Sequence, residues 1–289
     1  MFTIENDQLR ISVKSKGAEL DSLFSKETGL EYLWSGDPAF WAKKSPILFP
    51  IVGTLKDNTY HYNNKPYHLT RHGFARDRDF AVTAQTGNSL TLTLASDDAT
   101  LAVYPFTFRL EVVYTIVNNE LEVKYIVLNE GQNNMFFSIG GHPAFRLPLE
   151  EGIAYDDYYF EFSRLEDARR WMISHGGLIE PTTVPFITND NRLDISKDMF
   201  RDDAIVFKYL NSDSIKLKTK KSRHGLEVRF PRFPFLGLWA APHADFVCIE
   251  PWCGIADSTS TKQELINKEG INLLTPGQEF ERKWSVVVY

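Results

Sequence analysis

The sequence predicts an all-β protein, a large antiparallel β-sandwich with very little helix. Three observations support this fold class. Apolar and polar residues alternate with a period of two along many short runs, as in strands with one buried face. Turn residues separate these runs at short intervals, whereas βαβ folds place helical segments between their strands. Helical periodicity is scarce along the chain.

The strands are expected in the following order. Met1–Glu5 has the pattern of a strand, and Leu90–Leu94 alternates cleanly. Phe108–Val117 and Leu121–Val127 are joined by the short turn Asn118–Glu120, so we expect a hairpin. Further strands are expected at Tyr158–Phe162, Ile205–Tyr209, Ile215–Leu217, Leu226–Phe230, Leu236–Trp239, Phe246–Ile249 and Trp284–Tyr289.

Two segments depart from this pattern. Thr261 and Glu264 have the spacing of a capping box, so we expect one short helix near Thr261. Glu166–Ser196 is the least regular segment, and we expect it to form excursions on the rim. No internal repeat, low-complexity stretch or flexible linker divides the chain, so we expect a single domain over residues 1–289.

Composition restricts the classes of partner. The formal net charge of −6 argues against a nucleic-acid partner, which requires a basic face. No leader pattern is present, and no apolar run approaches the roughly 20 residues that span a bilayer, so we expect no membrane partner. The two cysteines, Cys248 and Cys253, suit a reducing cytoplasm, where we expect the protein to act. No feature of the sequence predicts an oligomeric state.

The most informative motif is the run Gly140-Gly141-His142-Pro143-Ala144-Phe145. It follows Met135–Ile139, an apolar segment with the character of a buried strand. The two glycines let the backbone turn or approach another group closely, and the proline stiffens the chain after the histidine. This arrangement suits a histidine that donates a proton. A buried, hydrogen-bonded histidine with a structural role is the alternative.

A second motif, Thr70–Arg76, places Arg71 beside His72 on a glycine-containing loop. Both side chains donate hydrogen bonds to hydroxyl or carboxylate oxygens, although an ordinary solvated loop fits the pattern too. His68 precedes His72 by four residues, but both lie in this predicted loop, and no other histidine has metal-site spacing. We therefore expect no metal and no cofactor.

A third motif, Phe246–Gly254, is an apolar strand that ends in Glu250, which a proline and a tryptophan follow. Partial burial would raise the pKa of this carboxyl toward the range of a general base, while a salt-bridged structural glutamate is the alternative. Trp239 and Trp252 add indole rings near this strand. Aromatic faces stack on the apolar face of a sugar, although most tryptophans simply belong to a core.

Together the three motifs resemble the aldose 1-epimerase (galactose mutarotase-like) family, and the chain is most similar to its shorter LacX-type branch. Phe49–Gly53 and Leu273–Gly277 also fit, so the resemblance spans nearly the whole chain in the expected order. It implies the large antiparallel β-sandwich called the supersandwich, with an open sugar cleft on a concave face. The implied partner is a small-molecule sugar.

The resemblance also implies an activity, the interconversion of α and β anomers of a hexose. His142 is the implied general acid, Glu250 the implied general base, and Arg71 with His72 position the sugar. The chemistry agrees, since a base must take the C1 hydroxyl proton and an acid must protonate the ring oxygen. We expect the pair on opposite sides of the sugar. We also expect His142 to hold its proton at neutral pH, because an ordinary histidine pKa is about 6.5.

In this family an aspartate also binds the sugar. Asp203 is the best match, with the adjacent Asp202 as the alternative. A related branch acts on hexose 6-phosphates and uses extra arginines. Arg76 with Lys43 and Lys44 would serve that purpose, although the upstream loop contains no arginine.

Two other functions remain open at this point. One is a carbohydrate-binding module that has kept the cleft and lost turnover. The other is a glycoside hydrolase on a β-sandwich, with Glu250 and an aspartate as its paired carboxylates. The identity of the aldose is not predicted by the sequence.

Overall fold

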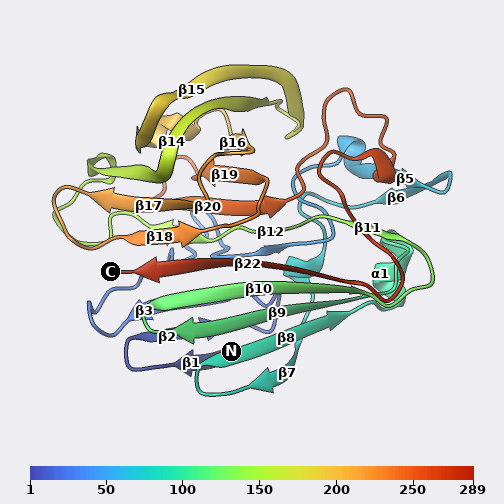
Figure 1. The fold of residues 1–289 in the computed structure, drawn as a ribbon, viewed down its shortest axis with the longest axis horizontal. Helices are drawn as coiled ribbons and strands as arrows, with labels where there is room; N and C mark the ends of the chain where they lie inside the picture. Colours follow the sequence, from blue (N-terminus) through green and yellow to red (C-terminus); the bar gives the residue numbers. More distant parts are fainter.

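Antiparallel strands make up most of the computed structural model, which describes residues 1–289 (Figure 1). One sheet contains 15 strands. Their bounds are β4 Ile47–Leu48, β7 Ala81–Gln85, β8 Ser89–Ala95, β9 Phe108–Val117, β10 Glu120–Asn129, β12 Ile139–Gly141, β13 Ala144–Arg146, β14 Tyr158–Ile173, β15 Ile179–Asp194, β16 Ile205–Lys208, β17 Ser214–Thr219, β18 Leu226–Arg229, β19 Phe235–Trp239, β20 Phe246–Cys253 and β22 Glu279–Val288.

Three smaller sheets accompany the large one, and they consist of β1-β2-β3, β5-β6 and β11-β21. The bounds of these strands are β1 Phe2–Glu5, β2 Leu9–Val13, β3 Leu20–Ser25, β5 Thr59–Tyr62, β6 Lys65–His68, β11 Met135–Phe137 and β21 Asn272–Leu274. Every pairing between strands is antiparallel. The predicted all-β fold class is confirmed.

The order of the large sheet brings together strands that are far apart in the sequence. It runs β4-β12-β20-β19-β16-β14-β17-β18-β22-β10-β9-β8-β7, with β13 also on β20 and β15 also on β14. The predicted hairpin is β9–β10, and its turn uses Asn118 at a φ of 55°. At the other end of the sheet, β20 lies between β12 and β19 (Figure 1). This is where the motif histidine and glutamate meet.

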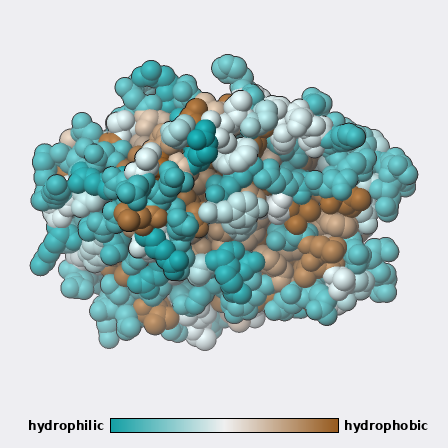
Figure 2. Space-filling view, turned by 45° about the horizontal axis from the view of Figure 1, so that its top comes forward, coloured by the Kyte–Doolittle hydropathy of each residue, from teal (hydrophilic) through white to brown (hydrophobic).

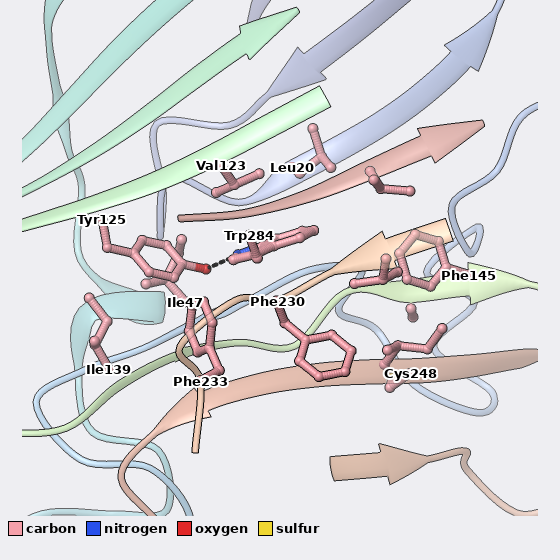
Figure 3. Close-up of a cluster of buried hydrophobic side chains, with 14 of the residues drawn as sticks. Leu20, Ile47, Val123, Tyr125, Ile139, Phe145, Phe230, Phe233, Cys248 and Trp284 are labelled. Carbon is pink, nitrogen blue, oxygen red and sulfur yellow. Dashed lines mark hydrogen bonds between the residues drawn. The ribbon is translucent and has the colours of Figure 1, made fainter. Parts of the chain in front are cut away.

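The hydrophobic core packs residues of the β1-β2-β3 sheet against residues of the large sheet. Along β9 and β10, buried residues alternate with half-buried ones, so each strand has one face in the core. The Tyr114 hydroxyl on β9 donates to the carbonyl of Ala18 at 2.7 Å, which ties the β1-β2-β3 sheet to that face. Trp284 donates its indole N–H to the Tyr125 hydroxyl at 2.8 Å inside the buried cluster (Figure 3). A Cβ on Gly141 would lie 2.9 Å from that hydroxyl, so this glycine permits a close approach.

Helix is confined to α1, Asp98–Val103, and short 3₁₀ turns. The expectation of a helix near Thr261 is wrong, because the Thr261 hydroxyl accepts the N–H of Gln263 in a local turn and Gln263 has a φ of 64°. The capping box belongs instead to Asp97, which begins α1. The 3₁₀ turns are η1 Lys56–Asn58, η2 Ala75–Asp77, η3 Tyr155–Asp157, η4 Lys197–Phe200 and η5 Leu265–Asn267.

The expectation of an irregular segment over Glu166–Ser196 is also wrong. Most of it belongs to β14 and β15, two 16-residue strands that pair as a long hairpin over one end of the molecule (Figure 1). Four register shifts interrupt the pairing. Because a shift by one residue moves the alternation to the other face, such shifts interrupt the period of two that marks a regular strand.

The surface agrees with the composition. Hydrophilic residues predominate on the face drawn in Figure 2, and hydrophobic residues form only small groups between them. No helix in the structure has the length and apolar character needed to cross a membrane.

Candidate active site

All eight residues predicted to act on or bind the substrate line one cavity of about 370 Å³, a volume at the lower end of the range for small-molecule sites. Asp203 lines it and Asp202 does not, which favours Asp203 as the contact to the ligand. The eight residues come from the loop before η2 and η2 itself, the residue after β12, the loop before β16, and strands β19 and β20: Arg71, His72, Arg76, His142, Asp203, Trp239, Glu250 and Trp252.

His142 and Glu250 lie side by side at the floor of this cavity. β12 and β20 pair with Gly140 opposite Trp252, and His142 follows β12, so it reaches the level of Glu250 on the next strand. The Nε2 atom of His142 is 3.4 Å from Oε2 of Glu250, and both side chains are at least nine-tenths buried. The expectation that they flank a sugar from opposite sides is wrong, because no ring fits in a gap of 3.4 Å. The two side chains face the cavity next to each other, on the same side of it.

Burial sets the protonation of this pair. It raises the pKa of Glu250 well above its usual range, an effect that the charge of Arg71 and the indole of Trp252 oppose. Burial also lowers the pKa of His142 to about 3, with the charges of Arg71 and Arg76 adding to the decrease. The expectation of a protonated His142 at neutral pH is therefore wrong. Both shifts disfavour the charged forms, so they favour a neutral imidazole beside a protonated carboxyl group.

His72 is fixed as a neutral hydrogen-bond donor. Its Nδ1 accepts the backbone N–H of Gly53 at 3.1 Å, so the proton of the neutral ring resides on Nε2. Burial and the nearby His142 keep its pKa well below the ordinary value. His72 has a φ of 71°, and the following Gly73 has the same φ and packs so closely that a Cβ would lie 2.4 Å from the carbonyl of Phe49. Such strain is typical of functional sites.

Arg71 and Asp203 form the polar rim of the cavity. The Arg71 guanidinium lies 3.5 Å from the Asp203 carboxylate. Asp203 has a φ of 74°, and its carboxylate accepts the N–H of Ala204. Arg170 on β14 donates to the backbone carbonyls of Asp202 and Asp203 at 3.2 and 3.4 Å, which holds this strained turn. No sequence motif marked Arg170, because its partners become neighbours only when the long hairpin folds.

The cationic set suggested for a phosphate is only partly assembled. Arg76 lines the cavity and donates to the carbonyl of Arg71 at 2.9 Å. Lys43 instead contacts Asp77, and Lys44 forms an ion pair with Asp21, and neither lysine lines the cavity. The expectation that these lysines join Arg76 at the site is therefore wrong, because both are paired elsewhere.

Three tryptophans form the aromatic part of the cavity wall. Trp252 lies across the sheet where glycines leave room for it: a Cβ would come within 2.7 Å of its ring at Gly140 and 2.4 Å at Gly237. Trp239 meets the ring of His142 edge-on. Trp41, which no sequence motif indicated, stacks on the imidazole of His142 with ring centroids 4.9 Å apart. Its position next to His142 arises from a loop that folds over the sheet.

The β14–β15 hairpin supplies an apolar wall that the sequence also did not reveal. Ile173, Gly177 and Ile179 line the cavity at the turn of the hairpin. The N–H of Ile179 donates to the carbonyl of Asp257 at 2.8 Å, which anchors the turn to the loop after β20. The cavity thus joins polar groups on one side to aliphatic groups on the other, as a sugar with polar and apolar faces requires.

One group of metal-ligating types occurs in the structure. His142, Cys248 and Glu250 each place one donor atom within 4.8 Å of the others. Two of these three are the buried pair of His142 and Glu250, and Cys248 is a buried thiol whose pKa burial raises well above its usual value. His68, by contrast, is exposed and bonds Thr59, apart from His72.

Comparisons with known proteins show the family to which this chain belongs. The family described as Aldose 1-epimerase matches residues 1–281, and the chain belongs to this family. It is 34% identical over 294 residues to protein LacX (chromosomal) of Lactococcus lactis subsp. lactis, covering 99% of this chain and 98% of that protein. A galactose mutarotase-related enzyme from Lactobacillus acidophilus is 36% identical with a TM-score of 0.94, covering 100% of this chain and 97% of that one. A galactose mutarotase-like protein from Lactobacillus casei is 30% identical with a TM-score of 0.94, covering 100% of both chains.

Proposed function

We propose that this protein is an aldose 1-epimerase, a mutarotase that interconverts the α and β anomers of a hexose by acid–base ring opening and reclosure. The observation that carries the proposal is the buried pair of His142 and Glu250, 3.4 Å apart, on the floor of a cavity of about 370 Å³. The C1 hydroxyl oxygen and the ring oxygen of a hexose are both bonded to C1. Two side chains as close together as His142 and Glu250 can therefore reach both oxygens at once. Family membership supports the same reaction.

The proton of the pair drives both half-reactions. A shift of this proton from Glu250 to His142 gives a carboxylate and an imidazolium. The carboxylate takes the C1 hydroxyl proton, the C1–O1 bond becomes a carbonyl as the C1–ring-oxygen bond breaks, and the imidazolium protonates the ring oxygen. After rotation about C1–C2, the reverse steps close the ring on the other carbonyl face. No proton or electron is gained or lost over the cycle.

Ring opening returns the pair to the protonation that burial favours in the free protein. The neutral imidazole and the protonated carboxyl are the forms present beside the open-chain aldehyde. The same neutral pair precedes the proton shift and follows ring opening, so burial stabilises both states equally. The ion pair between them is the form that burial disfavours, and the site must reach it during turnover. General acid and base groups each contribute roughly 10²–10⁴-fold.

The remaining cavity residues hold the sugar. Arg71 and the Nε2–H of His72 donate to hydroxyl oxygens, and the Asp203 carboxylate accepts from a hydroxyl. Trp239 and Trp252 offer ring faces to the apolar side of the pyranose. Arg76 beside Arg71 is the observation that favours a second candidate, a hexose-6-phosphate 1-epimerase.

Polarimetry tests these assignments. Freshly dissolved α-glucose, α-galactose and their 6-phosphates are mixed with the protein, and the rate of rotation change is compared with the spontaneous rate. Acceleration for the free hexoses supports the proposal, and acceleration only for the phosphates supports the second candidate. Binding without acceleration would identify a carbohydrate-binding module. Release of reducing sugar from oligosaccharides would identify a hydrolase.

A further inference from the structure

We propose that Trp41 is a positioning residue for His142: its indole holds the plane of the imidazole and stabilises the protonated ring during turnover. The proposal rests on the proposed function in one respect, because the protonated ring is an intermediate of that reaction. The positioning itself is a property of the folded protein and is measured without substrate.

The ring of His142 is held by aromatic neighbours. Trp41 is stacked on it with centroids 4.9 Å apart and planes inclined by 28°. Trp239 and His72 are both nearly perpendicular to it, with centroids at 5.6 Å. Trp41 is therefore the neighbour whose ring plane stacks on the imidazole and opposes its tilting.

Hydrogen bonds do not take over this task. In many sites a second group bonds the remaining nitrogen of a catalytic histidine and fixes its orientation. Here Nδ1 of His142 is buried and has no hydrogen-bond partner in another residue. Nε2 faces Glu250 at 3.4 Å, where the reaction takes place. The orientation of the ring consequently depends on stacking.

Trp41 is itself firmly held, although it belongs to the loop between β3 and β4. The backbone N–H of Trp41 donates to the carbonyl of Asp37, and the backbone carbonyl of Trp41 accepts the indole N–H of Trp34, both at 2.9 Å. Its other contacts are a stacked Phe246 at 5.6 Å and an edge-on Trp239 at 5.5 Å. A rigid indole can hold the ring that packs on it.

The same contact has an electrostatic consequence. The face of an indole carries negative charge density, so it attracts a cation above it, and this attraction strengthens where water is excluded. An imidazolium at residue 142 is such a cation. Loss of the indole should therefore slow the step in which His142 carries the proton, with little change in ground-state sugar binding.

The test compares Trp41→Leu, which keeps apolar cover without a ring, with Trp41→Phe, which restores a ring face. We expect Trp41→Leu to lower kcat by about 10-fold or more with KM within about threefold, and Trp41→Phe to recover most of kcat. Phe40→Leu is the matched control on the same loop, since the Phe40 ring packs against Trp34 instead of His142. Thermal melts confirm folding. A rise in KM with kcat unchanged would make Trp41 a sugar platform and overturn the proposal.

A second measurement is independent of turnover. In protein labelled on histidine, the ring proton resonances of His142, assigned with His142→Asn, are expected to be shifted by the stacked indole. In Trp41→Leu they should move toward the values of an unstacked histidine, and in Trp41→Phe they should move less. If the resonances of His142 do not move in Trp41→Leu, the positioning role is overturned, whether or not the parent protein accelerates mutarotation. If the parent accelerates no mutarotation but the resonances do move, the proposed function is contradicted and the positioning role is supported.

Discussion

The carboxyl of Glu250 on β20 and the imidazole of His142, which follows the adjacent strand β12, lie 3.4 Å apart, and the pKa shifts of both groups favour a neutral pair with one titratable proton. Burial produces this state, because it disfavours the charged form of each group. The pair therefore behaves as a unit in which the proton moves from one member to the other. Substitutions and changes of pH should both reveal this coupling.

The first prediction concerns the two members separately. Glu250→Gln preserves the shape of the side chain and removes the base, and His142→Asn removes the acid. Each should lower kcat by roughly two to four orders of magnitude, the range for a lost general acid or base. Polarimetry with subtraction of the spontaneous rate provides the measurement, and the exposed Glu151→Gln serves as control. A folded Glu250→Gln protein with parental activity would make Glu250 a structural residue.

The second prediction concerns the pH dependence of activity. With ordinary pKa values of 4.5 and 6.5, the pair would hold one proton only between those values, and kcat/KM would fall below pH 4.5 and above pH 6.5. Because the pKa of His142 is lowered to about 3, the lower edge of the one-proton window moves from 4.5 to about 3, and the raised pKa of Glu250 sets the upper edge. We expect kcat/KM to stay constant as the pH falls through 4.5, measured in buffers of constant ionic strength. A fall in kcat/KM centred near pH 4.5 would contradict the burial effect.

The third prediction concerns stability. The pKa of Glu250 is raised in the folded protein, so its contribution to stability is full below the unfolded value of 4.5 and is lost as the pH rises toward the folded value. A glutamine has no proton to lose. The Tm of Glu250→Gln relative to the parent should therefore increase from pH 5 to pH 8. Calorimetry at both pH values measures the difference, and a constant difference would show that Glu250 titrates normally.

The fourth prediction concerns sugar positioning. Arg71→Ala removes a charged donor at the cavity rim, and hydrogen bonds to charged groups contribute about 1.5–3 kcal/mol. We expect kcat/KM to fall by about 10- to 150-fold, largely through KM, and His72→Ala should weaken binding as well. The exposed Arg201→Ala is the control. Calorimetry with a methyl glycoside measures binding directly. If Arg71→Ala changes neither KM nor this binding, Arg71 does not contact the sugar.

Local sequence patterns predicted the strands well because alternation is a local property. The expected strand Phe108–Val117 coincides with β9, since one of its faces is buried along its whole length. Patterns failed in the β14–β15 hairpin, where register shifts break the alternation. Candidate site residues could be predicted where a chemically reactive side chain lies beside residues that restrict or free the backbone, as in the Gly140–Phe145 motif.

Other parts of the site had no local signal. Trp41 and Arg170 act on residues about 100 and 30 positions away, and only the folded sheet makes them neighbours. The protonation of His142 was not predictable either, because burial depends on the complete structure. The sequence indicated the reacting groups, and the fold determines their distance and charge.

The last prediction concerns the packing that supports Glu250. Gly237 pairs with Glu250 across β19 and β20, and a Cβ at Gly237 would lie 2.4 Å from two ring atoms of Trp252. Gly237→Ala must therefore displace the indole, which Gly140 contacts closely at another atom, toward the cavity that it lines. Overpacking of this kind costs about 1–3 kcal/mol, and the shifted ring should also disturb the cavity floor. We expect a lower Tm and a reduced kcat/KM for Gly237→Ala. Gly87→Ala is the matched control, because nothing lies within 4 Å of a Cβ there. Equal Tm and activity in both variants would show that Trp252 moves freely and does not define the floor of the site.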